Sequence, residues 1–454
     1  MRLRRAFAAT AVLAVVTAGM ATVSATAEEA PPASAQPAPS YQEREAAANR
    51  PRSVPKRTDA KASASCHAIQ QQAAADGKGE ALCIETLSAS EVPKRLKSVR
   101  TSAAGAGVVW CDEKELGQVF VTRTSICEHQ LIHAVLINTQ TGEPLGDAYL
   151  TVKQEVNTRD VDGSPMNVYF DEYFYMRVQA VSGALVAGFN VAIDADCAPT
   201  SACQQGPGPW TGPAPVTLLS EKDGTWLRSW KNTTLHDTLA LGYTITASLG
   251  TERARYSWGV NESNAWQVRC DNEITKYAGC VVPAFIPTFV TDYAKYPAGS
   301  DYVNSAMQYI KTHPGREGDG QPLHREANDT VATKNRNRVC DSSFKPEDFF
   351  NKKYEIQCDE YPFARTKESG GQLGITSGSQ CKQFSAMPGF KDQEPRQNWT
   401  TQALGVPHGP ANCARASMIK PDNEGIGGDL GRFYTKNRMI DNDPFWVKAP
   451  TWRP

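Results

Sequence analysis

Twelve cysteines constrain this chain more than any other feature of its sequence. An even number of cysteines behind an export-like beginning predicts a framework of disulfides. The zinc alternative lacks a paired Cys-x-x-Cys motif, so disulfides are the preferred interpretation. Each bridge would stabilise the fold by about 2–4 kcal/mol, chiefly by constraining the unfolded chain. Connectivity does not follow from sequence, and our hypothesis joins near neighbours: Cys66 with Cys83, Cys111 with Cys127, Cys197 with Cys203, Cys270 with Cys280, Cys340 with Cys358, and Cys381 with Cys413.

Residues 1–27 have the three parts of an export signal peptide. Early arginines form a basic start, residues 6–23 are apolar, and Ala25-Thr26-Ala27 fits a small-x-small cleavage site. Gly19 and several threonines make this stretch a weak membrane span, and no other apolar run is long enough to cross a bilayer. We therefore expect a secreted, extracellular protein without stable membrane insertion. General secretion is preferred, and the twin-arginine route suggested by Arg4-Arg5 is the alternative.

The length after this signal allows two or three domains. Residues 28–65 are rich in proline, alanine, serine and charge, and their low apolar content predicts a disordered linker. Residues 66–106 form a short disulfide-linked segment in which we expect helices at 69–75 and 80–87.

Residues 107–289 have the pattern of an all-β domain. Runs of β-branched and aromatic residues alternate with turn sequences, and few stretches have helical spacing. We expect an antiparallel β-sandwich or a barrel-like domain, whose role the sequence does not indicate. The expected strands include residues 119–121, 133–138, 148–156, 167–181, 185–193 and 239–248.

Residues 290–454 are mixed in character and predict a small α+β domain. The spacing of Val303, Met307 and Ile310 predicts a helix over residues 302–311. The formal net charge of the chain is −1. Because this gives no overall attraction to nucleic acid, any phosphate binding must come from a local cluster of basic residues.

The most informative motif in this region is Cys358-Asp359-Glu360-Tyr361-Pro362-Phe363-Ala364, followed by Glu368-Ser369-Gly370-Gly371. Adjacent acids repel each other, and folding alone does not require them here. A divalent cation would relieve the repulsion, because hard cations such as Mg²⁺ bind carboxylate oxygens. The structural alternative is a solvated acidic turn before a strand.

A second block contains Pro421-Asp422-Asn423-Glu424-Gly425, and a hydrophobic strand near Asp443-Pro444-Phe445-Trp446-Val447 closes the chain. Together the two blocks resemble the NucA/NucB family of secreted bacterial deoxyribonucleases over about residues 300–454. The resemblance implies a secreted, metal-dependent, sequence-nonspecific endodeoxyribonuclease that acts on DNA with Mg²⁺ or Mn²⁺, and we expect a monomer. The region around residues 379–414 is an insertion relative to compact family members.

The resemblance also nominates site residues. Asp359 and Glu360 are candidate metal ligands or general bases, and the sequence does not rank them. Neighbouring side chains on a strand point to opposite faces, so both reach one ion only from a turn or bulge. Glu368 matches the family acid before Gly-Gly. Asn423 is a candidate neutral oxygen ligand, with a simple turn-forming role as its alternative.

A basic stretch before the acids supplies candidate phosphate ligands. Arg325, Arg336 and Arg338 could grip phosphate with paired hydrogen bonds. The alternative for such a charge run is a solvated helix face. His408 is a further candidate base, and an exposed loop histidine is the preferred interpretation.

Other chemistries find little support. Residues 128–133 contain two histidines, but they do not form a His-Glu-x-x-His zinc motif and lie in a strand-like region. There is no Gly-x-Ser-x-Gly elbow, phosphate loop or dinucleotide fingerprint. Two rival functions stay open. One is a secreted β-sandwich binding protein with an inactive nuclease-like domain, and the other is a nuclease toxin with an immunity or inhibitor protein as its partner.

Overall fold

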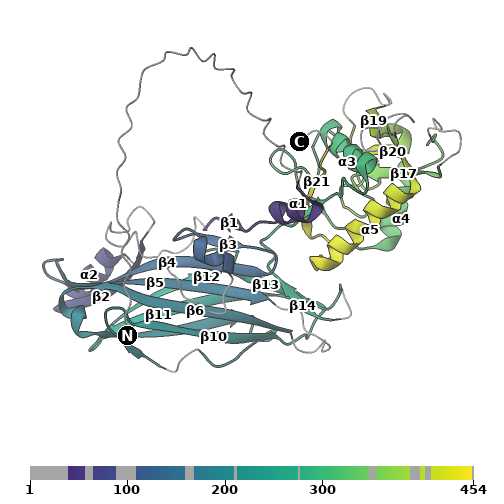
Figure 1. The fold of residues 1–454 in the computed structure, drawn as a ribbon. Helices are drawn as coiled ribbons and strands as arrows, with labels where there is room; N and C mark the ends of the chain where they lie inside the picture. Colours follow the sequence, from purple (N-terminus) through teal and green to yellow (C-terminus); the bar gives the residue numbers. More distant parts are fainter. Residues whose placement is uncertain are drawn as a thin grey trace, which may run out of the picture. The chain divides into compact units, whose positions relative to one another are not determined.

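Long antiparallel strands dominate the first two thirds of the molecule (Figure 1). The computed structural model describes residues 39–56, 65–87, 109–158, 168–208, 212–274, 277–346, 354–388, 399–403 and 411–451. Residues from Ser40 to Pro454 form one unit by their contacts. Within the described ranges, no helix is both long and apolar enough to span a membrane.

Two antiparallel sheets share one hydrophobic core in the β-rich region. Strand β7 alternates buried and exposed side chains along its whole length, as expected for a strand with one face on a core. The larger sheet contains β1 (Arg52–Val54), β3 (Val119–Val121), β4 (Ser125–Asn138), β5 (Pro144–Thr158), β6 (Val168–Val181), β10 (Glu221–Trp230) and β8 (Cys203–Gln205) in this order, with β2 (Glu80–Leu87) paired to β4. The smaller sheet contains β14 (Gly279–Val281), β13 (Gln267–Asp271), β11 (His236–Leu249), β7 (Phe189–Ala198) and β9 (Ala214–Val216), with β12 (Glu252–Gly259) paired to β11.

The prediction of an antiparallel β-rich N-terminal region is therefore confirmed, and its arrangement is that of a sandwich. Aromatic rings contribute to this core. Tyr243 lies 5.4 Å from Trp258 and 5.2 Å from Trp266 between ring centroids. Such ring pairs contribute about 0.5–1.5 kcal/mol each beyond the area they bury.

Three local predictions in the N-terminal part differ from the structure. The strand expected at 185–193 begins only at Phe189, because residues Gly183–Ala187 form a 3₁₀ helix before β7. Residues 80–87 form strand β2 instead of a helix, because Leu82 and Ile84 enter the core while the backbone pairs with β4. Residues 41–54 lie inside the predicted disordered linker, yet they form helix α1 (Tyr41–Ala48) and strand β1. The helix begins with a capping box between Ser40 and Glu43, and β1 pairs with β3. The predicted helix at 69–75 is present as α2 (Cys66–Ala75).

The C-terminal part combines helices with two small sheets and has its own core. The expected helix at 302–311 is present, shifted toward the N-terminus. The elements are β15 (Thr288–Val290), α3 (Pro297–Tyr309), β16 (Leu323–His324), α4 (Asp329–Val339), β17 (Ile356–Tyr361), β18 (Lys382–Pro388), β19 (Trp399–Ala403), β20 (Ala414–Ile419), α5 (Lys420–Lys436) and β21 (Pro444–Lys448). Their sheets have the orders β15-β21-β16 and β17-β20-β18-β19.

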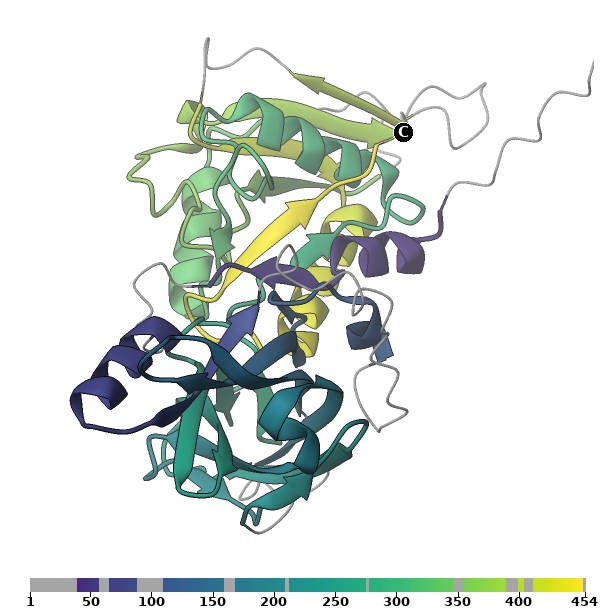
Figure 2. The same cartoon turned by 90° about the vertical axis from the view of Figure 1, so that its left-hand side faces the viewer.

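Helix α1 packs near the C-terminal elements although it begins the described chain (Figure 2). Asn49 exchanges two hydrogen bonds with the backbone of Thr288, at 2.8 and 3.1 Å. Lys436 in α5 forms an ion pair with Glu45 at 2.9 Å. Residues 40–54 thus connect the C-terminal core to the larger β-sheet.

A buried ion network joins the smaller β-sheet to the loop before β21. Arg438 contacts Asp271 of β13 through Nη2 and Oδ1 at 2.8 Å. The Asp443 carboxylate accepts hydrogen bonds from the guanidinium groups of Arg269 in β13 and of Arg123 in the β3–β4 turn, the second at 3.0 Å. The five side chains are mostly or fully enclosed, so the contacts are rigid links between the two cores.

All six predicted disulfides are present, and the neighbour pairing is confirmed. Every bridge closes within the β-rich region or within the C-terminal region. The bridge between Cys340 and Cys358 ties the end of α4 to β17, directly beside the acid motif.

Candidate active site around strand β17

Strand β17 carries both adjacent acids, and both are buried. Asp359 is 8% exposed and Glu360 is 5% exposed. Antiparallel pairing with β20 is regular through both residues, with Asp359 opposite Ala416 and Glu360 opposite Arg415. Because the strand has no bulge here, the two side chains point to opposite faces of the sheet. They do not form the turn that would let both chelate one ion.

The two faces have different surroundings. Ala416 belongs to the C-terminal core, which also contains Tyr302 of α3. Asp359, in register with Ala416, therefore lies on this helix-covered face. Glu360 shares its face with Arg415 and lies toward α4, where Arg336 approaches it with an Nε to Oε1 distance of 3.4 Å.

Burial makes both carboxylates harder to ionise. It raises the pKa of Asp359 well above its usual value, and the charge of Glu360 raises it further. Burial also raises the pKa of Glu360, while Arg336 and the backbone N–H of Ala364 oppose the increase. The buried acid pair has one exposed arginine, Arg336, beside it, and this arginine only partly opposes the increase in pKa that burial causes. Such pairs occur preferentially at functional sites.

Helix α4 presents the predicted basic stretch. Its N-cap, Asn328, accepts hydrogen bonds from the backbone N–H groups of Thr330 and Val331 at 2.9 and 3.2 Å. Arg336 and Arg338 lie on its exposed face. Arg336 faces Glu360, whereas Arg338 donates to the carbonyl of Ile375 at 3.2 Å. Both arginines are exposed, as the alternative of a solvated helix face predicts. The helix nevertheless places the guanidinium of Arg336 beside Glu360.

Arg325 lies apart from that basic face. Its guanidinium packs over Tyr434 at 5.1 Å from the ring centroid and donates to the carbonyl of Met439. Burial lowers its pKa. The structure therefore holds the half-buried Arg325 against Tyr434 and Met439, and among the described residues no hydrogen bond or ion pair joins it to Glu360.

Glu368 forms a pair that sequence reasoning missed. Its Oε1 lies 2.7 Å from Nδ1 of His324, and its Oε2 accepts the backbone N–H of His324 at 2.8 Å. With a proton on Nδ1, the Nε2 atom is left as an acceptor, which is how a carboxylate orients a histidine base. No sequence spacing joins these residues, because the contact depends on the loop after β17 folding back onto β16.

One loop connects the acids of β17 to the pair of His324 and Glu368, which we call the dyad. The loop from Phe363 to Gly371 begins at the end of β17 and carries Glu368. Asn335 of α4 holds it by donating to the carbonyl of Ala364 at 2.9 Å. A Cβ on Gly371 would lie 2.6 Å from Asn335, so glycine permits this approach. Among described residues, no hydrogen bond or ion pair joins the dyad directly to the acid pair.

Asn423 lies in the first turn of α5, against β17. Its amide donates to Oε1 of Gln357 at 3.0 Å and to the carbonyl of Cys358 at 3.4 Å. The structure thus brings it near the acid motif and uses its amide to hold the strand. His408 lies outside the described residues.

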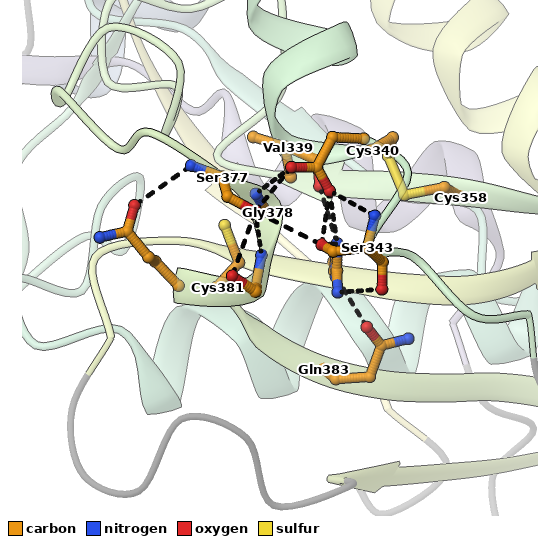
Figure 3. Close-up of polar contacts among 12 residues, drawn as sticks. Val339, Cys340, Ser343, Cys358, Ser377, Gly378, Cys381 and Gln383 are labelled. Carbon is orange, nitrogen blue, oxygen red and sulfur yellow. Dashed lines mark hydrogen bonds and ion pairs between the residues drawn. A yellow bond between two sulfur atoms is a disulfide. The ribbon is translucent and has the colours of Figure 1, made fainter.

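A polar cluster fixes the backbone between the two disulfides around β17 (Figure 3). Asp341 accepts hydrogen bonds from the Ser377 hydroxyl at 2.6 Å and from the Gly378 N–H at 3.0 Å. Burial would raise the pKa of Asp341, but these bonds and those from Ser343 hold it well below its usual value. Arg415 donates to the Ser343 hydroxyl at 3.0 Å. These bonds connect the residues after α4 to the turn at Ser377 and Gly378 and to Arg415 of β20.

The donor chemistry at β17 suits a divalent cation. Carboxylate oxygens are the ligands that Mg²⁺ and Mn²⁺ prefer, and because the two acids point apart, one carboxylate, that of Glu360, faces the side that Arg336 reaches. In the described ranges, three potential ligand groups come together only at Cys111, Cys127 and His129. The two cysteines form a disulfide, so that group is not a metal site.

A comparison with protein families finds a match in the C-terminal region. The family model Deoxyribonuclease NucA/NucB matches residues 312–390, and the resemblance inferred from the acid motif is thereby confirmed. The match contains the His324–Glu368 pair, helix α4 and both acids of β17, but it does not reach Asn423. No curated protein and no solved structure matches the chain.

Proposed function

We propose that this protein is a secreted, metal-dependent, sequence-nonspecific endodeoxyribonuclease. The observation that carries the proposal is the buried acid pair of β17 with Arg336 at its edge, inside the segment that matches the deoxyribonuclease family. Phosphodiester hydrolysis requires charge neutralisation at the phosphate, an activated water and help for the leaving oxygen. The residues around β17 are suited to each of these tasks.

Glu360 is the principal metal ligand in this proposal, because it lies on the face that Arg336 reaches. Asp359 lies on the opposite face, and burial and Glu360 raise its pKa; a cation bound beside Glu360 would favour the charged form of both acids. A bound Mg²⁺ or Mn²⁺ would polarise the phosphate and lower the pKa of a bound water.

The other residues position the substrate and move protons. Arg336 and Arg338 bind phosphate oxygens, for which a guanidinium offers two parallel donors. Glu368 orients His324, whose free ring nitrogen accepts a proton from the attacking water. Asn423 positions β17 and supports the site from the α5 side.

The proposal includes DNA as the substrate, export through residues 1–27 and action as a monomer outside the cell. Six disulfides agree with an oxidising compartment. Sequence-nonspecific cleavage follows from recognition through phosphate and charge, because such contacts carry no base information.

Supercoiled plasmid provides the direct test. Purified protein should convert it to open-circular and linear forms with Mg²⁺ or Mn²⁺, and EDTA should stop the conversion. Circular DNA has no ends, so its cleavage separates an endonuclease from an exonuclease. Plasmid that stays supercoiled across a series of divalent metals would exclude the proposal.

A further inference from the structure

A cationic site separate from the acids of β17 lies where residues 47–52 meet the C-terminal part of the molecule. A cleft there is lined by residues from 47–52, by residues from α3, β15 and the end of the chain around β21, and by Arg316 and Glu317. Its volume is about 550 Å³, within the roughly 300–1,000 Å³ typical of ligand sites. Neither acid of β17 lines it, so it is separate from the site described above. We refer to it as the cationic cleft.

Four basic side chains line the cationic cleft against one carboxylate. They are Arg50, Arg52, Arg316 and Lys448, and the carboxylate is Glu317. Arg52 already balances Glu317, with an Nη1 to Oε1 distance of 2.6 Å. Arg316 contacts Asp319 at 3.2 Å. Arg50 and Lys448 are exposed and form no ion pair within the described part of the chain, so their charge is available to a ligand.

The remaining lining of the cationic cleft is largely apolar. Ala47 is exposed and Ala48 and Pro51 are half-buried, so these three residues offer apolar surface in the cleft. A groove that combines positive charge with apolar surface suits a single nucleic-acid strand, because the charges follow the backbone while sugars and bases contact the apolar part. A small inorganic anion would use only the charges.

We propose that the cationic cleft binds the phosphate backbone of a DNA strand as a second contact, separate from the acid pair. This inference rests on the proposed function and adds a substrate-binding surface to it. The chain has a formal net charge of −1, so a local cluster has to supply the attraction to DNA. Two of the four basic residues, Arg50 and Arg52, come from residues 47–52. In this proposal, the packing of that segment on the C-terminal core serves to position these two charges for DNA.

The test measures binding of a fluorescein-labelled single-stranded oligonucleotide by anisotropy across a salt series. Glu360→Gln is present in every sample so that the probe is not cut. Arg50→Gln combined with Lys448→Gln removes the two free charges of the cleft. Arg253→Gln combined with Arg255→Gln is the matched control, because both arginines are exposed on β12 of the β-rich region. Circular dichroism checks the fold of each variant.

We expect the cleft variant to raise Kd at least tenfold at 0.1 M salt. It should also reduce the slope of log K against log salt by about 1.4, or roughly 0.7 for each lost phosphate contact to a single strand. The control should leave both values unchanged. Equal effects of the two variants, or no effect of the cleft variant, would overturn the proposal. Hydrolysis of bis-p-nitrophenyl phosphate by the unsubstituted protein reports on the acid site alone. Absence of this hydrolysis would count against the proposed function, whereas the anisotropy result tests DNA binding by the cationic cleft separately.

Discussion

Asp422 shows how a single buried carboxylate makes stability depend on pH. It lies at the start of α5 and is 4% exposed. Its Oδ2 atom has no hydrogen-bond partner among the residues that the structure describes, while the backbone N–H of Gly299 bonds to the carboxylate. Burial raises the pKa of Asp422 to about 6, and the Gly299 bond only partly opposes this increase. The folded state therefore holds this proton more tightly than the unfolded state.

Stability should fall as pH rises between the unfolded pKa, about 3.8, and the folded pKa, about 6. In that range the unfolded state has already lost the proton. We predict that Asp422→Asn stabilises the protein at pH 8 by about 1–2 kcal/mol and has little effect at pH 4. Thermal unfolding across pH measures this. Glu424→Gln, an exposed acid on the same helix, is the control. A constant offset between Asp422→Asn and the parent at every pH would contradict the account.

Residue-scale predictions from sequence succeeded where the chemistry was local. The cysteine pairs were predictable because each partner lies a short distance along the chain. The position of Arg325 was not predictable, because its guanidinium packs on Tyr434, which lies more than a hundred residues later in the chain. The contact between His324 and Glu368 likewise depends on a tertiary arrangement of the loop, which the spacing of these residues in the sequence does not indicate.

At the scale of elements, the placement of β17 depends on the disulfide beside it. The bridge from Cys340 to Cys358 holds the end of α4 against the strand that carries the acids. The bridge from Cys66 to Cys83 closes a loop of nearly the same length, with a separation of 17 against 18 residues. Loop-closure entropy predicts a similar stabilisation, about 3 kcal/mol, for both.

We predict that replacing Cys340 and Cys358 by alanine lowers stability by about 3 kcal/mol and also lowers the DNA cleavage rate at temperatures where the variant stays folded. Replacing Cys66 and Cys83 by alanine should cost similar stability and leave the rate intact. Denaturant unfolding and plasmid cleavage on the same samples measure both effects. Equal cleavage rates in the two variants would show that the bridge beside β17 stabilises without positioning the acids.

Elements were predictable from sequence where their local pattern agreed with their tertiary setting. Strands β3, β5, β6 and β11 follow from runs of β-branched and aromatic residues. Strand β2 was predicted as a helix, because its pairing with β4 is not visible in its own residues. Helix α1 was not predicted, because residues 28–65 around it are rich in proline, alanine, serine and charge. The contacts of Asn49 and Arg52 with Thr288 order this segment from a distance.

At the scale of the whole molecule, the change of pattern near residue 290 predicted two regions with different architectures. The disulfides respect that boundary, but buried ion pairs cross it. Arg438 binds both the carboxylate and the backbone carbonyl of Asp271. Sequence does not show such pairs, because charge patterns do not reveal which distant residues are buried together.

We predict that Asp271→Ala destabilises the protein by about 3–5 kcal/mol, since it leaves the buried charge of Arg438 unbalanced. The double variant with Arg438→Ala should recover part of this loss, because both charges are then absent. Denaturant unfolding measures the cycle, and nuclease activity after graded heating reports the C-terminal region separately. A change below about 1 kcal/mol for Asp271→Ala would show that the two regions are stable independently of this link.

The central claim is that the acids of β17 form the catalytic centre of a deoxyribonuclease. The most direct measurement is the steady-state rate of DNA cleavage by Glu360→Gln, which has nearly the same shape as the parent and lacks the charge. The exposed residue Glu355, just before the same strand, gives the matched control Glu355→Gln. We predict at least a hundredfold loss for Glu360→Gln, corresponding to about 3 kcal/mol of transition-state stabilisation, with no loss of melting temperature because a buried charge has been removed. The control should cleave at the parent rate. A Glu360→Gln variant that cleaves DNA at the parent rate would contradict the account.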